Sequence, residues 1–170
     1  FMAESSDKQQ KVVFVPAFTG LGAPYWNSEA KGAIFGLTQA TSPNELMRAT
    51  LEAVCYQTRD LLEAMHADWF SKEISYNVLR VDGGMISNDW CMQFLSDILG
   101  TPIDCPAVLE STALGAAYLA GYQEGFYSAP DTFSKRWRLD KRYYPKFTEE
   151  EREKRYAIWK KATELTLSFN

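Results

Sequence analysis

The chain has 170 residues, of which 46% are hydrophobic and 24% charged, as in ordinary globular proteins with a core of their own. The net charge of -4 gives no electrostatic reason to expect nucleic acid or an anionic membrane as a partner. We find neither an apolar stretch long enough to span a bilayer nor a signal peptide. Three scattered cysteines with one histidine argue against a Cys/His zinc site. We therefore expect a reduced, cytoplasmic protein.

The first elements are short strands around a loop. Residues 1–11 are polar without clear periodicity and open on a phenylalanine, so we expect the chain to be part of a longer protein. Lys11–Pro16 is apolar after the lysine and predicts a buried strand. A loop rich in glycine, proline and aromatic residues follows, and Gly32–Gly36 predicts a second strand.

A long helix is predicted next. Ser42 can cap its start, Pro43 suits the first helical position, and Glu45 completes a capping box. The pattern predicts a helix to about Ala67. The side chains that we expect to form much of its buried stripe are Leu46, Thr50, Ala53, Val54, Leu61 and Met65.

The centre of the chain combines a strand, a glycine pair and a helix. Asn77–Val81 predicts a strand, and a helix is predicted from Asn88 to Leu99, where Gly100 supplies a left-handed stop. Gly83 and Gly84 stand between them. Glycines at such a turn let backbone approach a ligand closely, and the first N–H groups of the helix face the same spot. A plain tight turn is the alternative.

The last third continues the alternation of strands and helices. Thr101–Cys105 predicts a short strand, and a helix follows to about Gln123, whose small residues would allow very close packing. The next segment, 125–144, is aromatic and irregular, and the capping box Thr148–Glu151 opens a helix to about Leu167 that we expect to pack as an appendage. The alternation predicts an α/β domain.

Several motifs, in order along the chain, resemble the FGGY carbohydrate kinases. They are GAIFGL at 32–37, ATLE at 49–52, YQTRD at 56–60, RVDGGM at 80–85 and TALGAAYLAG at 112–121. Within that family, PAFTGLGAPYW at 16–26 resembles the members that phosphorylate glycerol rather than a sugar. The resemblance covers residues 12–170, whereas residues 1–11 match poorly.

The resemblance implies an actin-like, ribonuclease-H-like ATPase fold, with residues 12–170 as most of the C-terminal, nucleotide-binding domain and its first strands upstream. It implies ATP or ADP with Mg as ligands, and contacts to the adenosine part from the backbone at Gly84 and the side chain of Asn88. The polyol-binding residues and the catalytic aspartate would lie upstream. We therefore expect no catalytic or metal-binding residue in this chain and no activity of the segment alone.

Three functions remain open on the sequence. The first is the C-terminal part of a kinase that makes glycerol 3-phosphate, with glycerol bound through the absent N-terminal domain. The second is a kinase of the same family for another polyol or a sugar. The third is a non-catalytic fragment that binds nucleotide or another protein. We expect neither nucleic acid nor membrane as a partner, and self-association is left open.

Overall fold

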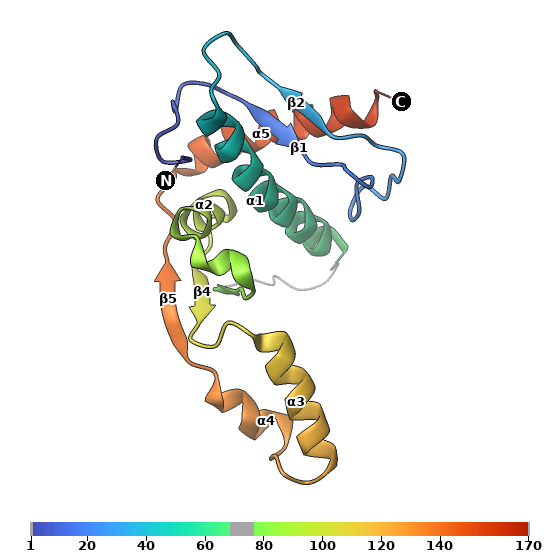
Figure 1. Ribbon diagram of the computed structural model, residues 1–170, viewed down its shortest axis with the longest axis vertical. Helices are drawn as coiled ribbons and strands as arrows, with labels where there is room; N and C mark the ends of the chain where they lie inside the picture. Colours follow the sequence, from blue (N-terminus) through green and yellow to red (C-terminus); the bar gives the residue numbers. More distant parts are fainter. Residues whose placement is uncertain (1, 69–76, 170) are drawn as a thin grey trace.

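The computed structural model describes residues 2–68 and 77–169. Three helices pack together beside two small sheets, and the other two α-helices lie in an arm that extends from them (Figure 1). The strands are β1 (Val13–Val15), β2 (Ala33–Phe35), β3 (Leu79–Arg80), β4 (Ile103–Pro106) and β5 (Leu139–Tyr143). The α-helices are α1 (Pro43–Asp68), α2 (Asp89–Leu99), α3 (Ser111–Gln123), α4 (Pro130–Phe133) and α5 (Glu149–Leu167), and the 3-10 turns are η1 (Gly84–Ser87) and η2 (Ser134–Arg136).

The two sheets differ in direction. β1 and β2 are antiparallel, with Val13 opposite Phe35. In the other sheet β4 is central: β3 runs parallel to it and β5 antiparallel. The strand expected over Asn77–Val81 is shorter in the structure, where β3 is an edge strand of the described sheet. The Leu79 and Val81 amides donate to the carbonyls of Pro102 (2.9 Å) and Asp104 (3.1 Å) and so join β3 to β4.

The predicted helix ends are confirmed where capping side chains were recognised. Glu45 accepts from the Ser42 amide at 2.8 Å while the Ser42 hydroxyl accepts from the Asn44 amide, which is the reciprocal pattern of a capping box. Thr148 caps α5 by accepting from the Glu151 amide at 3.2 Å. Gly100 ends α2 in the left-handed conformation, with φ 65°.

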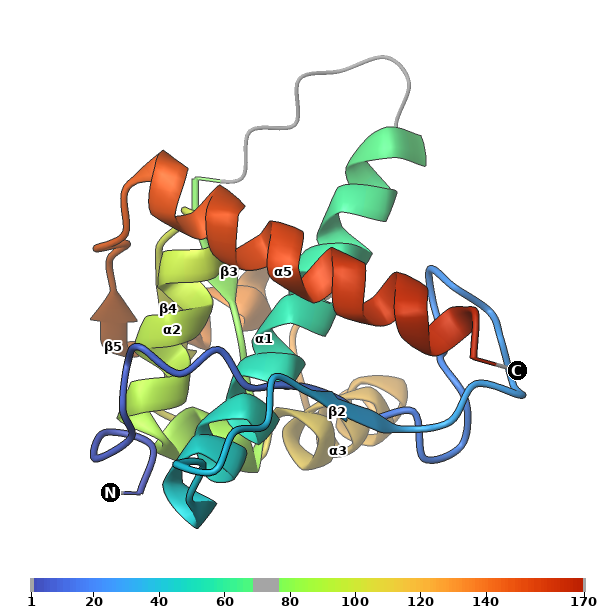
Figure 2. The ribbon, with the colours of Figure 1, turned by 90° about the horizontal axis from the view of Figure 1, so that it is seen from above.

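The helix α5 is not an appendage, contrary to the expectation. It lies across α1 and α2 (Figure 2), and its Trp159 is fully buried. Asp60 of α1 accepts from the Tyr156 hydroxyl at 2.6 Å and from the Trp159 indole N–H at 2.8 Å. Arg59 extends the contact by pairing with Glu153 at 2.7 Å. The appendage prediction was wrong because these partners are distant in sequence.

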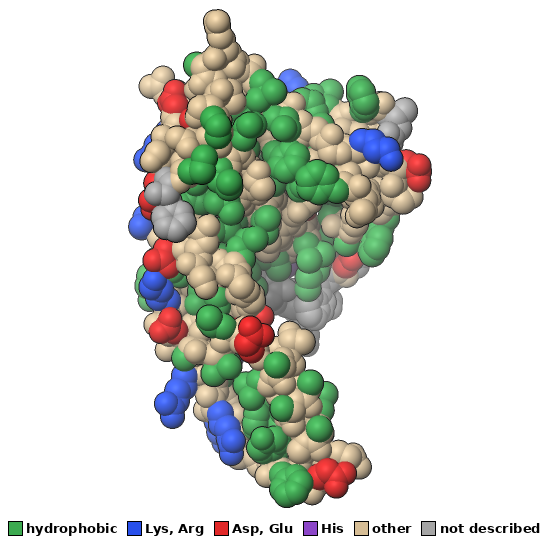
Figure 3. Space-filling view, viewed as in Figure 1, with side chains coloured by type: hydrophobic (Ala, Val, Ile, Leu, Met, Phe, Trp, Pro, Cys, Tyr) green, Lys and Arg blue, Asp and Glu red, His purple; other side chains and the backbone are tan. Residues whose placement is uncertain are grey.

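The buried face of α1 also differs from the prediction. Apolar side chains expected inside are exposed, and Figure 3 shows hydrophobic groups gathered over this helix. Of the expected stripe, Leu46, Thr50, Val54, Leu61 and Met65 are exposed, whereas Ala53 is buried. The helix instead buries a polar row, Glu45, Arg48, Glu52, Arg59 and Asp60, beside Ala49, Ala53, Cys55 and Tyr56. Hydrogen bonds to distant segments hold Glu45, Arg48, Arg59 and Asp60, whereas Glu52 pairs with Arg48 on the same helix. Local periodicity does not reveal the distant partners.

The arm consists of α3, α4 and their connections. Of α3 only Tyr118 is buried, against Phe133 at a ring separation of 4.0 Å. The expected close packing is found at Gly121, where a Cβ would lie 2.5 Å from the Tyr127 ring, but not at Gly115. The predicted irregular segment 125–144 also contains β5, which sequence reasoning missed because LDKRY has no apolar run and four of its five residues are exposed. Among the described residues, no helix combines the length and the apolar character needed to cross a membrane.

Candidate functional site

The predicted ligand seat lies where β3 leads through η1 into α2. Gly83 has φ 96°, a conformation that favours glycine, so the turn itself explains this residue. The Ile86 amide donates to the Gly83 carbonyl at 3.1 Å, and the Asn88 amide donates to the Met85 carbonyl at 3.0 Å. These two bonds fix the path of the chain from the sheet edge to the start of the helix.

Gly84 has no such internal explanation. Its φ lies outside the left-handed region, and a Cβ built on it meets no heavy atom within 4 Å among the described residues outside its chain neighbours. The residue is exposed. Neither packing nor backbone geometry within the described chain therefore demands glycine at this position. A ligand that approaches the backbone closely would demand it.

Asn88 has a structural role that the sequence analysis did not assign. It is the N-cap of α2, and its Oδ1 accepts from the Cys91 amide at 3.1 Å. The cap uses the oxygen of the side-chain amide, and the two N–H donors belong to its nitrogen. One asparagine can therefore hold the helix start and donate to a ligand at the same time. The structure brings Gly84 and Asn88 to the two ends of one short turn.

The negative charge of Asp89 is balanced next to this turn. Its carboxylate accepts from the Lys141 ammonium at 2.6 Å and from the Tyr143 hydroxyl at 2.7 Å. Hydrogen bonds from these two groups hold the pKa of Asp89 below its ordinary value. Because Lys141 and Tyr143 belong to β5, the missed strand fixes the first turn of α2. This pairing offsets the repulsion that Asp89 would otherwise exert on an anionic ligand.

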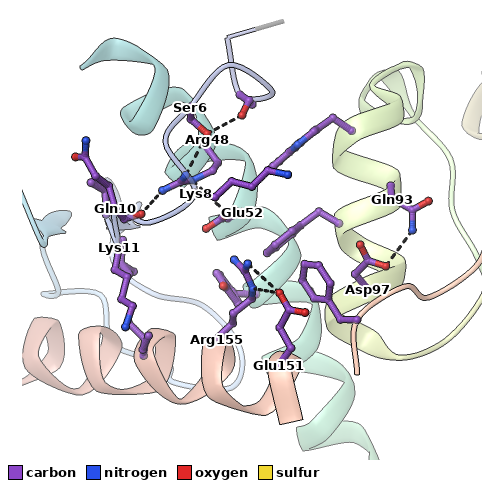
Figure 4. Close-up of a pocket in the computed structure, with 18 of the residues that line it drawn as sticks. Ser6, Lys8, Gln10, Lys11, Arg48, Glu52, Gln93, Asp97, Glu151 and Arg155 are labelled. Atoms are coloured by element: carbon purple, nitrogen blue, oxygen red, sulfur yellow. Dashed lines mark hydrogen bonds and ion pairs between the residues drawn. The ribbon is translucent and has the colours of Figure 1, made fainter. Parts of the chain in front are cut away.

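A separate cavity of about 560 Å³ lies between α1, α2, α5 and the N-terminal segment (Figure 4). It is lined by Trp90 and Phe94 of α2, by Arg48 and Glu52 of α1, and by residues of α5 and the N-terminal segment. Arg48 donates to the carbonyls of Asp7 and Gln10 and so holds the N-terminal segment on α1. Gly84 and Asn88 do not line this cavity, so its size gives no support to the nucleotide seat.

Glu52 lines this cavity, and its environment shifts the pKa of its carboxyl. Its carboxyl is buried, and burial raises its pKa to about 7, although the guanidinium of Arg48 lies 3.5 Å away and opposes the shift. In the folded protein Glu52 therefore holds its proton at pH values where the unfolded chain has already released it. Folding stability should then decrease as the pH rises from about 4.5 to about 7.

Glu52→Gln should remove this pH dependence, because an amide fills the same space without ionising. We expect the variant to be more stable than the wild type above pH 7, by about 1–3 kcal/mol, and to differ little below pH 4.5. Urea unfolding across this pH range is the measurement. The exposed Glu150 of α5 provides the control substitution, Glu150→Gln, which should not change the slope with pH. Equal slopes for the wild type and Glu52→Gln would contradict the assignment.

Comparison with known proteins places the chain in a family. The model of the C-terminal domain of the FGGY family of carbohydrate kinases matches residues 1–124. The chain belongs to this family. The match includes the segment 1–11 that the sequence analysis set apart. It also covers the strand, the glycine pair and helices α1 to α3.

Relatives with a stated activity resemble the whole chain. Glycerol kinase of Roseobacter denitrificans is 54% identical over 168 residues, which are 99% of this chain and 34% of that protein. A crystal structure of Plasmodium falciparum glycerol kinase with ADP superimposes with a TM-score of 0.82 and 37% identity, over 98% of this chain and 33% of the other. The chain thus spans about a third of the length of the relatives that it matches.

The fold expectation is confirmed by these matches. A xylulose kinase from Rhodospirillum rubrum shares the fold at a TM-score of 0.77 with 21% identity, over 99% of this chain and 33% of the other. The α/β architecture is therefore that of the C-terminal domain of FGGY kinases, the actin-like ATPase fold.

Proposed function

We propose that this chain is the nucleotide-binding part of an ATP-dependent kinase that transfers a phosphoryl group to glycerol, giving glycerol 3-phosphate and ADP. The observation that carries the proposal is the place of Gly84, an exposed glycine without an internal reason in the turn that leads from β3 into α2. Its neighbour Asn88 presents an amide at the start of α2. The family membership and the 54% identity to a glycerol kinase supply the reaction.

Gly84 and Asn88 contact different parts of the nucleotide in this proposal. At Gly84 the bare backbone lets the adenosine part lie against the turn, where any side chain would occupy the same space. The Asn88 amide nitrogen then donates to the ribose or the base. ATP supplies the phosphoryl group. We assign no catalytic residue to this chain, because phosphoryl transfer needs a positioned base and phosphate contacts that none of its motifs provides.

Magnesium would enter with the nucleotide phosphates. Among residues 2–68 and 77–169, no group of three histidine, cysteine, aspartate or glutamate side chains is arranged to hold a metal ion. Mg²⁺ commonly binds through substrate phosphates with few protein ligands, so this arrangement is compatible with Mg-ATP. We further infer a cytoplasmic protein, since Cys55, Cys91 and Cys105 are all free thiols. A place in glycerol metabolism follows from the proposed reaction.

The activity is tested by coupled ADP release from the intact protein that contains this chain. We expect turnover with Mg-ATP and glycerol, and little with xylulose or gluconate. Turnover with a sugar alone would keep the nucleotide site and discard glycerol as the acceptor. Absence of turnover with all three, in a protein that binds ADP, would favour the non-catalytic module.

Asn88→Asp separates the two roles of this residue. The carboxylate still accepts from the Cys91 amide, so the free energy of unfolding should stay within about 0.5 kcal/mol of the wild type. The N–H donors are lost and a negative charge is added, so the affinity for ADP should fall about tenfold. Calorimetric titration of the intact protein measures this change.

Asn88→Ala is the matched comparison, because it removes both functions. It should lose a similar amount of affinity and about 0.5–2 kcal/mol of stability as well. If Asn88→Asp binds ADP as tightly as the wild type, the residue is a helix cap only and the nucleotide contact is misplaced.

A further inference from the structure

Two cysteines meet in the core between α1 and α2. The Sγ atoms of Cys55 and Cys91 lie 3.7 Å apart, and the Cys55 thiol also lies 3.6 Å from the Cys91 carbonyl oxygen. Both residues are buried, with 1% and 0% of their surfaces exposed. A disulfide bond is about 2.0 Å long, so the two sulfurs need to approach by less than about 2 Å to bond. They come from helices that are packed against each other, so the approach brings together two elements that are already in contact.

The two thiols are chemically unequal. A hydrogen bond from Cys55 lowers the pKa of the Cys91 thiol, whereas the same contact and burial raise the pKa of Cys55. Glu52, once it is ionised above about pH 7, acts on the pKa of Cys55 in the same direction. Both sulfurs are buried, so an oxidant reaches them when the contact between α1 and α2 opens locally. Since the thiolate is the reactive form, Cys91 then reacts first and Cys55 resolves the product.

We propose that Cys55 and Cys91 are a reversible oxidation site at which a peroxide converts the thiol pair into a disulfide that joins α1 to α2. The Cys91 sulfur attacks one peroxide oxygen, the O–O bond breaks, and water leaves with the thiol proton. Cys91 then carries a sulfenic acid. The Cys55 sulfur attacks this sulfur, the S–O bond breaks, and a second water leaves with the Cys55 proton. Two thiols are oxidised and one peroxide is reduced to two waters.

The disulfide acts on the start of α2. The Cys91 amide donates the hydrogen bond that Asn88 uses as a helix cap, so drawing Cys91 toward α1 displaces the residue that carries this bond. The Asn88 side chain then moves relative to Gly84. This consequence rests on the proposed nucleotide site, whereas formation of the disulfide does not. We expect the oxidised protein to bind ADP about five- to tenfold more weakly, a coupling of ordinary size between two linked sites.

Peptide mapping of the intact protein tests the bond. After treatment with hydrogen peroxide, the protein is denatured, alkylated and cut with trypsin, which releases Cys55 on peptide 49–59 and Cys91 with Cys105 on peptide 81–135. We expect these peptides to be linked within one molecule, and dithiothreitol to release them. Cys105→Ser is the matched control, because Cys105 is a buried thiol on β4 and its loss should leave the link in place. Cys91→Ser should abolish it.

The outcomes separate the two parts of the proposal. If Cys55 and Cys91 are still alkylated after peroxide, or if Cys91 carries a sulfinic acid without a link, the oxidation site is disproved. A linked protein that binds ADP as tightly as the reduced form disproves the effect on Asn88. If the reduced protein does not bind ADP, the proposed function fails, and the mapped link still decides the chemistry of the pair.

Discussion

Replacing Gly84 with valine should weaken ADP binding by the intact protein about a hundredfold or more, since the branched side chain takes the space that the adenosine part would occupy. The fold should tolerate the change. A Cβ at this position meets no heavy atom within 4 Å among the described residues outside its chain neighbours, and the backbone is not left-handed. We therefore expect the free energy of unfolding to change by about 1 kcal/mol or less. Calorimetric titration and urea unfolding measure the two effects separately.

Gly22→Val is the matched control for this experiment. Gly22 is also exposed, also has a φ outside the left-handed region, and also faces open space on the side of a Cβ. The same chemical change at Gly22 should leave ADP binding unaltered. If Gly84→Val binds ADP normally, or if Gly22→Val loses the same affinity, the special role of Gly84 is refuted.

Trp159→Ala should have the largest effect on stability, a loss of about 3–5 kcal/mol, because it leaves a large cavity in the core. Trp159 is fully buried, stacks on Tyr56 of α1 at a ring separation of 5.3 Å, and donates to Asp60 at 2.8 Å. Its removal also deprives a buried carboxylate of one of two hydrogen-bond donors. The free energy of urea unfolding of the intact protein is the measurement.

Two further variants separate the contributions of burial and of the indole N–H donor to this loss of stability. Leu165→Ala, on the same helix but with 47% of its surface exposed, should cost less than about 1 kcal/mol. Trp159→Phe keeps an aromatic ring in the core but not the N–H donor, so its cost should fall between the two. A loss for Trp159→Ala no larger than for Leu165→Ala would mean that α5 does not contribute to the core as the structure shows.

Local signals in the sequence predicted the helices well. Ser42 and Thr148 mark helix starts with side chains that bond to backbone amides within one turn, and Gly100 marks an end by its own conformation. Each of these devices acts within four residues, so it can be recognised without knowledge of the tertiary structure.

Tertiary contacts explain the errors. Asp60 is buried because α5 brings two donors to it from almost a hundred positions away, and the exposed strand β5 exists because β4 offers it a partner. Leu61, by contrast, is apolar and exposed. Periodicity assumes that apolar residues lie inside, and α1 departs from that rule over most of its length.

The candidate site was predictable in part. The glycine pair and Asn88 could be selected from the strand–turn–helix pattern and the family resemblance. The structure then distinguished Gly83, which the turn requires, from Gly84, which it does not. The balance of Asp89 by Lys141 and the contact between Cys55 and Cys91 were not predictable, because each joins elements that are far apart in the chain.

A crystal structure of the intact protein with ADP would test the central claim most directly. Our account predicts the adenosine part against the backbone at Gly84, with the Asn88 amide nitrogen within hydrogen-bond distance of the ribose or base. The same crystals should show Asn88 still capping α2. ADP bound elsewhere, for example in the cavity beside Trp90 and Arg48, with Gly84 facing solvent, would contradict it.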